Sequence, residues 1–188
     1  MNRKIMPALI IVSLLTALLL IIILRTDISS PEEYYSSGTS GQSSDGDVSV
    51  TLMIDCSVIL DDMDQVPSEL RGSGLLPEDG IFLPETEFTV AEGSSVFDLL
   101  LIATKRYRIQ MEYTGRPDGG LSPIYIKSIG HLYEFSCGPL SGWMFSVNDV
   151  FSGSDSSGYI LKPGDKVKWA FTLDLGKDIG NDFNGGSQ

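Results

Sequence analysis

The chain has 188 residues and carries 25 acidic against 13 basic side chains, for a net charge of −12 at pH 7. A surface of this sign repels nucleic acids and anionic lipid headgroups, so the composition argues against a nucleic-acid partner. One histidine and two cysteines are too few for a zinc site, and no metal ligand set is predicted.

The first segment predicts a membrane anchor. Arg3 and Lys4 precede an apolar run over residues 5–24, which as a helix spans about 30 Å, close to one hydrocarbon core. No small-residue cleavage motif follows, which favours an uncleaved signal anchor over residues 1–26. The basic start then predicts a single-pass protein of the cell membrane with its C-terminal part outside the cell. The alternative is a cleaved signal and a secreted protein.

The next segments divide by composition. Residues 27–47 are rich in serine and glycine and aperiodic, which predicts a flexible linker. Residues 48–180 have the usual size of one domain. Residues 181–188 have the composition of a disordered tail.

Residues 48–180 predict several strands and one helix. The helix begins after Ser95, which with Asp98 forms a capping-box pattern before an apolar helical face. Apolar alternation predicts strands over 48–56, 86–90, 109–113, 124–129, 143–147 and 166–173. Asn148-Asp149 is a candidate hairpin turn. The predicted class is α+β, a small mixed or antiparallel sheet with one packed helix in a β-grasp-like order.

The chain shows no catalytic set. His131 is the single histidine and has no nucleophile or metal partner in the sequence. Asp61, Asp62 and Asp64 lack the spacing, glycine and terminal glutamate of a calcium loop. We therefore expect a protein that is not an enzyme and requires no cofactor.

Aromatic residues gather in the C-terminal half, where most are expected in the core. A ligand platform needs exposed aromatic rings beside polar groups. The candidates at loops and strand ends are Tyr133, Phe135, Ser141, Trp143, Asn148 and Phe151.

Three blocks carry a family resemblance: residues 90–100, residues 132–148 and residues 161–169, with Gly138-Pro-Leu-Ser-Gly-Trp-Met-Phe-Ser-Val-Asn148 the most specific. In this order they resemble the transcobalamin-like C-terminal domain family, a DUF4430-type domain of secreted and surface proteins of Gram-positive bacteria. In the vitamin carriers, a domain of this type closes over one face of cobalamin. The resemblance thus implies cobalamin or another corrinoid as a ligand.

The resemblance also implies a disulfide between Cys56 and Cys137, because family members often have cysteines at these positions. The extracellular side of a membrane permits such bonds. The alternative is a pair of buried free thiols.

Two functions remain open. The first is a membrane-tethered extracellular binding module for a corrinoid or similar planar ligand. Tyr133, Phe135 and Trp143 would pack on the ring, and Ser141 and Asn148 would donate or accept hydrogen bonds. The second is a cell-surface protein-interaction or structural module without a small-molecule ligand.

Overall fold

The computed structural model describes residues 46–116 and 123–181, which all belong to one compact unit, Gly41–Gln188. The predicted anchor over residues 1–26 lies outside the described residues, as do most of the predicted linker and tail. Within the described ranges, no helix is long and apolar enough to cross a membrane.

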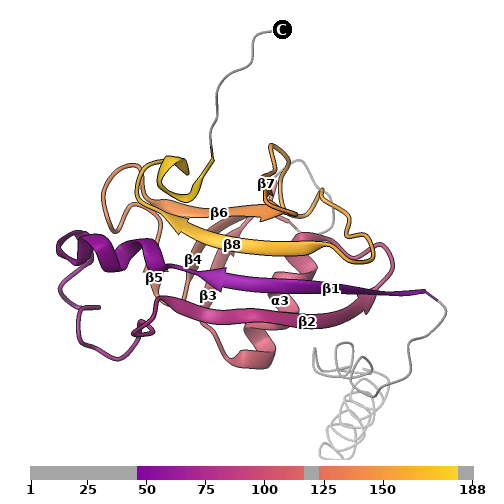
Figure 1. Ribbon diagram of the computed structural model, residues 1–188, viewed down its shortest axis with the longest axis horizontal. Helices are drawn as coiled ribbons and strands as arrows, with labels where there is room; N and C mark the ends of the chain where they lie inside the picture. The colour runs from indigo at the N-terminus through magenta and orange to yellow at the C-terminus, as the bar shows by residue number, and fades with distance from the viewer. Residues whose placement is uncertain (1–45, 117–122, 182–188) are drawn as a thin grey trace, which may run out of the picture. The chain divides into compact units, whose positions relative to one another are not determined.

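The described residues form eight strands, one α-helix and two 3₁₀ helices (Figure 1). The elements are β1 (Asp47–Asp55), η1 (Ser57–Gln65), β2 (Ile81–Ala91), α3 (Val96–Tyr107), β3 (Met111–Thr114), β4 (Tyr125–Ile129), β5 (Leu132–Tyr133), β6 (Gly142–Val147), β7 (Val150–Phe151), β8 (Lys166–Thr172) and η2 (Lys177–Ile179). The predicted α+β class is confirmed.

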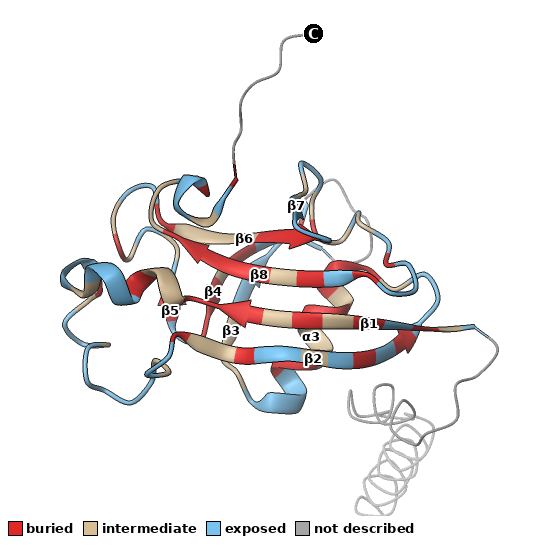
Figure 2. Ribbon diagram, viewed as in Figure 1, coloured by how far each residue is buried: buried red, intermediate tan, exposed pale blue. Residues whose placement is uncertain are grey.

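The larger sheet has five strands in the order β2-β1-β8-β6-β7. β1 pairs antiparallel with β2 and parallel with β8, so the sheet is mixed, as predicted. Leu52 and Ile54 of β1 are fully buried and lie opposite Val167 and Trp169 of β8. The alternation of buried and more exposed residues along β1 is visible in Figure 2, and it leaves one face of the sheet open.

Helix α3 begins where the sequence predicts. The Ser95 hydroxyl accepts a hydrogen bond from the Asp98 backbone N–H at 3.1 Å, and the Asp98 carboxylate accepts one from the Ser95 N–H at 2.9 Å. This reciprocal pair is the capping box. The helix ends at Arg108 in a left-handed conformation, φ 56°. Its buried face shares one core with the five-stranded sheet.

The strands β3, β4 and β5 form a second, antiparallel sheet of three strands. It lies on the same side of the larger sheet as α3 (Figure 1), and Ile126 and Ile129 of β4 join the common core. Phe97 of α3 meets Tyr113 of β3 edge to face, with ring centroids 4.8 Å apart. The two sheets and the helix therefore enclose one apolar interior.

The hairpin turn at Asn148-Asp149 is confirmed. Both residues have positive φ, 52° and 64°, as a type I′ turn requires. The Asn148 amide donates to the Asp165 carboxylate at 2.9 Å, and its side-chain oxygen accepts from the Lys166 N–H at 3.0 Å. The turn joins β6 to the short strand β7.

The predicted disulfide is wrong. Cys56 and Cys137 are free thiols, both buried in a second apolar cluster that includes Ile59, Leu132 and Phe171. Burial raises the pKa of Cys56 to about 12 and also raises the pKa of Cys137. The cysteines act here as small apolar side chains.

Candidate functional site

Three large apolar side chains are exposed together at one end of the domain. Phe135 is 59% exposed, Leu140 42% and Leu175 57%. The Leu175 N–H donates to the Leu140 carbonyl at 3.1 Å, and the Phe135 N–H donates to the Ser141 carbonyl at 2.9 Å. These backbone contacts bring the loop 134–141 and the turn after β8 together, and we call Phe135, Leu140 and Leu175 the apolar end.

Ser141 shapes the turn that presents Leu140. Its side chain is buried, and its hydroxyl donates to the Gly138 carbonyl at 2.9 Å while accepting from the Cys137 N–H at 3.1 Å. Gly138 has φ 108°, which a residue with a side chain rarely adopts. The hydroxyl that was predicted to bind a ligand is thus engaged inside the turn, where it positions its neighbours.

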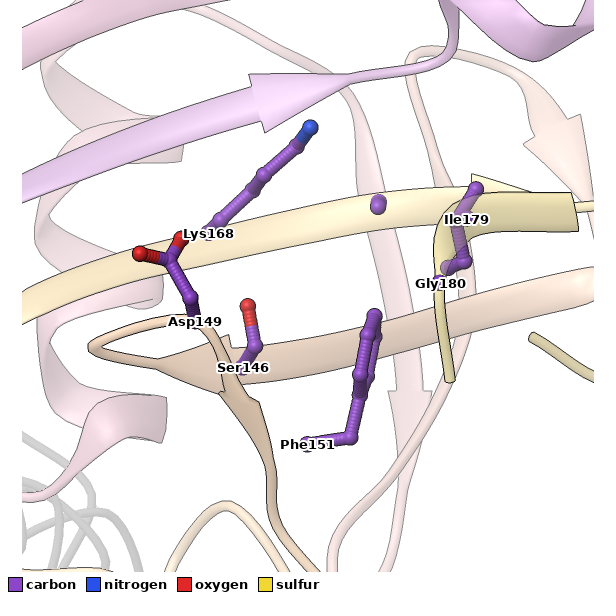
Figure 3. A pocket seen from close by; sticks show the side chains of 7 residues that line it. Ser146, Asp149, Phe151, Lys168, Ile179 and Gly180 are labelled. Carbon is purple, nitrogen blue, oxygen red and sulfur yellow. The ribbon is translucent and has the colours of Figure 1, made fainter. Parts of the chain in front are cut away.

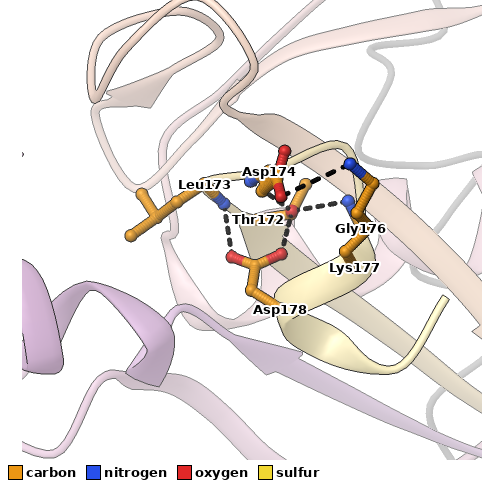
Figure 4. Close-up of polar contacts among 6 residues, drawn as sticks. All are labelled: Thr172, Leu173, Asp174, Gly176, Lys177 and Asp178. Atoms are coloured by element: carbon orange, nitrogen blue, oxygen red, sulfur yellow. Dashed lines mark hydrogen bonds and ion pairs between the residues drawn. The ribbon is translucent and has the colours of Figure 1, made fainter.

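The exposed Leu175 belongs to a turn that a polar network holds at the end of β8; Figure 4 shows this network. The Asp178 carboxylate accepts hydrogen bonds from the Thr172 hydroxyl and from the Leu173 N–H. The Thr172 hydroxyl oxygen accepts from the N–H groups of Asp174 at 3.1 Å and Gly176 at 2.7 Å. The network fixes a tight turn over residues 172–178 with Leu175 at its tip.

Two residues of the apolar end have strained backbones. Phe135 has φ 60° and Leu175 has φ 50°, in the left-handed region. For a residue other than glycine this conformation costs about 1–2 kcal/mol, and it persists only where the surroundings hold it in place. The apolar end therefore combines strain with solvent exposure, two unfavourable features that folding alone does not require.

The other predicted residues near this end are Tyr133 and Trp143. Trp143 is half-buried, its indole N–H donates to the Leu132 carbonyl at 2.8 Å, and its ring packs edge to face on Phe171 at 5.3 Å. Tyr133 is exposed, and its hydroxyl donates to the Glu112 carboxylate. Trp143 thus supports the end from beneath, while Tyr133 borders it.

Asn148 and Phe151 lie elsewhere. Asn148 follows the end of β6 and lies five positions after Trp143, or about 17 Å away at the usual rise of a strand. Phe151 pairs with Ser146 and borders a depression of about 130 Å³ on the open face of the larger sheet (Figure 3). The structure therefore divides the six predicted site residues between two places.

The depression itself is small and polar on one side. Lys168 lines it, and its ammonium pairs with the Asp55 carboxylate at 2.7 Å. Burial raises the pKa of Asp55, but hydrogen bonds from Lys168 and Ser57 outweigh it and leave this pKa below its ordinary value. Ligand pockets usually enclose about 300–1,000 Å³. The depression has less than half of that volume.

Leu140 and Leu175 were missed as site residues. Each lies in a turn between strands or after the last strand, where an apolar residue has no neighbour in sequence to pack on. Leu175 precedes Gly176, and Leu140 follows Gly138-Pro139. A leucine beside turn-forming residues is therefore the sequence signal that could have identified both site residues.

The described residues offer few features that could bind a metal ion or an anion. Residues 46–116 and 123–181 contain no group of three or more histidine, cysteine or acidic side chains placed to hold a metal ion. The first N–H groups of α3 are occupied, because Val96 donates to the Tyr159 carbonyl and Phe97 to the Ser156 carbonyl, both at 3.0 Å. The loop 152–161 therefore closes the helix end at which an anion could otherwise bind.

The fold is that of an α+β domain with a five-stranded mixed sheet and an exposed apolar end. Residues 93–172 match the family described as Domain of unknown function (DUF4430). This match overlaps all three sequence blocks, and the resemblance drawn from them is confirmed. Among curated proteins, no sequence matches this chain.

Two solved structures are similar to parts of this one. The first is haptocorrin in complex with Cbi, with 14% identity and a TM-score of 0.46 over 74% of this chain. The chain covers 28% of the haptocorrin chain. The second is a proposed metal-binding protein from Ruminococcus gnavus ATCC 29149, with 9% identity and a TM-score of 0.36 over 68% of this chain and 96% of that chain. Likenesses at these scores assign no function.

Proposed function

We propose that this protein is a non-catalytic binding module, tethered to the membrane by residues 1–26, which captures its ligand outside the cell at the apolar end. One observation carries the proposal: Phe135, Leu140 and Leu175 are exposed together, and two of them are held in strained conformations. Because strain and exposure both cost free energy, a binding role is the simplest reason for retaining them.

The energetic gain on binding is substantial. Burying a leucine or phenylalanine side chain contributes about 1.5–3 kcal/mol relative to full exposure. The three side chains are each about half exposed, so covering them contributes ~3 kcal/mol in total before the cost of association. Phe135 also supplies an aromatic ring, and aromatic residues often dominate binding energies.

The ligand proposed first is a corrinoid or a similar planar molecule. The support is the family resemblance of residues 132–148, together with the exposed Phe135 ring, which can stack on a planar macrocycle. Tyr133 borders the patch. Ser141 and Trp143 would act by holding the turn and the ring in place, since both are already engaged within the domain.

The test is calorimetric titration of the full chain in lipid nanodiscs with cyanocobalamin and with cobinamide. We expect micromolar or tighter binding, and Phe135→Ala should weaken it at least tenfold. Val150→Ala is the matched control, because Val150 is also an exposed apolar residue but lies at the opposite end of β6. Absence of heat with both ligands at millimolar concentration would reject corrinoid capture.

A second candidate is a protein partner at the same surface. The observation that favours it is the exposure of Phe135, Leu140 and Leu175 on the surface, at 59%, 42% and 57%. A photo-crosslinking residue at Leu140 in intact cells should yield one discrete adduct, which Phe135→Ala removes and Val150→Ala preserves. Identical adducts in both variants would exclude this surface.

A further inference from the structure

The outer face of the three-stranded sheet presents tyrosines beside carboxylates. Ile129 of β4 and its partners Met111 and Leu132 point into the core, so their neighbours in sequence point outward. Those neighbours include Glu112 and Tyr133, on opposite sides of Ser128.

The outward-facing positions of the sheet continue beyond Ser128, because the pairing of β3 with β4 changes register there. The pairing of β3 with β4 shifts between Glu112 and Tyr113, so that Ile126 points into the core as Ile129 does. Tyr125, the residue before Ile126, therefore points outward as well, and it is half exposed. We call Glu112, Tyr125, Tyr133 and Glu134 the tyrosine face.

Each tyrosine on this face is tied to one carboxylate. The Tyr133 hydroxyl donates to Glu112, two strands away, so its ring crosses β4 and covers Ser128, which is fully buried. The Tyr125 hydroxyl donates to Glu134. These hydrogen bonds orient both rings and both carboxylates before any ligand arrives, which lowers the entropy lost on binding.

The negative charges of this face are not neutralised by the domain. Across residues 46–116 and 123–181, no lysine, arginine or histidine lies within ion-pair distance of Glu112 or Glu134. Among the described residues, Lys127 of β4 likewise forms no ion pair with Glu112 or Glu134. Burial and the bond to Glu134 raise the pKa of Tyr125 to about 12, so its hydroxyl stays a neutral donor.

We propose that the tyrosine face is a docking site for a basic segment of a partner protein, bound through its arginine or lysine side chains. Each tyrosine ring offers a cation–π surface, and each neighbouring carboxylate offers acceptor oxygens to the same cation. Guanidinium groups fit this pairing well, because they stack on rings and donate to carboxylates at once. This site is separate from the apolar end and does not depend on corrinoid binding.

The probe is fluorescein-labelled octa-arginine, titrated with the full chain in neutral-lipid nanodiscs at 0.15 M salt and followed by fluorescence anisotropy. The double variant Glu112→Gln/Glu134→Gln should raise the dissociation constant about tenfold. The double variant Glu69→Gln/Glu78→Gln removes the same charge from exposed positions elsewhere and should change it less than twofold. Far-UV circular dichroism and thermal midpoints check that all variants fold.

A second pair of variants separates the ring from the hydroxyl. Tyr125→Phe/Tyr133→Phe keeps both rings and should retain most of the affinity. Tyr125→Leu/Tyr133→Leu removes the rings, and its dissociation constant should be at least threefold higher than that of the phenylalanine variant. The proposal is overturned if the wild-type chain does not bind the peptide. It is equally overturned if the two glutamate double variants weaken binding alike, since the attraction would then be the general field of an acidic protein.

Discussion

Leu175 has a conformation that lowers the stability of the domain but exposes an apolar side chain for binding. Its left-handed backbone would suit glycine, yet a leucine occupies the tip of the turn and points into solvent. A leucine in this position gains little from packing and carries the steric cost of its Cβ. Phe135 shows the same combination. Both residues are therefore places where the local preference of the sequence and the observed conformation disagree, which is typical of functional positions.

We expect Leu175→Gly to stabilise the domain by about 0.5–1 kcal/mol, because relief of strain exceeds the added entropy of the unfolded chain. Leu175→Ala keeps the Cβ and should show no such gain. Urea denaturation followed by tryptophan fluorescence measures the difference. If the glycine variant is less stable than the alanine variant, the leucine is not strained in the way that its φ indicates.

The buried thiol and the tyrosine face predict a loss of stability at high pH. Burial raises the pKa of Cys56 from 9.0 to about 12, and burial with the bond to Glu134 raises that of Tyr125 from 10.0 to about 12. Both groups hold their protons more tightly when folded. Their contribution is therefore complete below about pH 9 and is lost as the pH rises toward 12.

The free energy of unfolding should accordingly fall between pH 9 and pH 11, as measured by urea titrations at each pH. Cys56→Ala removes one of the two groups, and its stability should decline less steeply over the same interval. An unchanged slope in this variant would mean that Cys56 ionises normally and is not buried as described.

At the scale of elements, the turn after β8 decides where the apolar end is presented. Asp178 in η2 reaches back to Thr172 and Leu173, so a strand end and a short helix are joined by side-chain hydrogen bonds. The same segment continues to Asn181, which is buried and donates its N–H to the Gly176 carbonyl at 2.8 Å. The sequence assigned Asn181 to the tail.

Asp178→Ala should loosen this turn and leave the Leu173 N–H without its acceptor, at a cost of about 1–2 kcal/mol. Amide hydrogen exchange should speed up at Leu173 and Gly176 while the rates in β1 stay unchanged. Asp174→Ala is the control, since it removes only an exposed ion pair with Lys177 at 3.6 Å. Equal exchange rates in both variants would show that Asp178 does not hold the turn.

At the scale of the whole domain, α3 and the three-stranded sheet lie on the same side of the larger sheet and share one core with it. Leu100 is fully buried in that core with residues of β1, β4 and β8. The parallel pair of β1 with β8 joins segments more than 100 residues apart in sequence. A core assembled from such distant segments should unfold as one unit, because neither sheet buries its inner face alone.

Leu100→Ala should therefore destabilise the domain by about 2–5 kcal/mol and leave a single transition. Urea unfolding followed by tryptophan fluorescence reports on the larger sheet, which holds both tryptophans, and far-UV circular dichroism reports on all elements. Coincident curves are expected for the wild type and the variant. Separate midpoints would show that the three-stranded sheet is an independent unit.

Local patterns in the sequence determined the helix, the longer strands and the Asn148-Asp149 turn, because capping, alternation and turn chemistry act between near neighbours. Short elements escaped prediction: β5 and β7 have two residues each, too few to show a period, and the one predicted helix did not include η1. β2 extends through Pro84, which an edge strand tolerates.

The sequence by itself thus determined the class of the domain, its resemblance to the DUF4430 family over residues 93–172 and its acidic charge. Only the tertiary structure decided that Cys56 and Cys137 remain free thiols within an apolar cluster. It likewise decided that Asn148 and Phe151 lie apart from Phe135, and that Leu140 and Leu175 join Phe135. These outcomes depend on which loops meet in space, and that is set by long-range strand pairing such as β1 with β8, which no local pattern encodes.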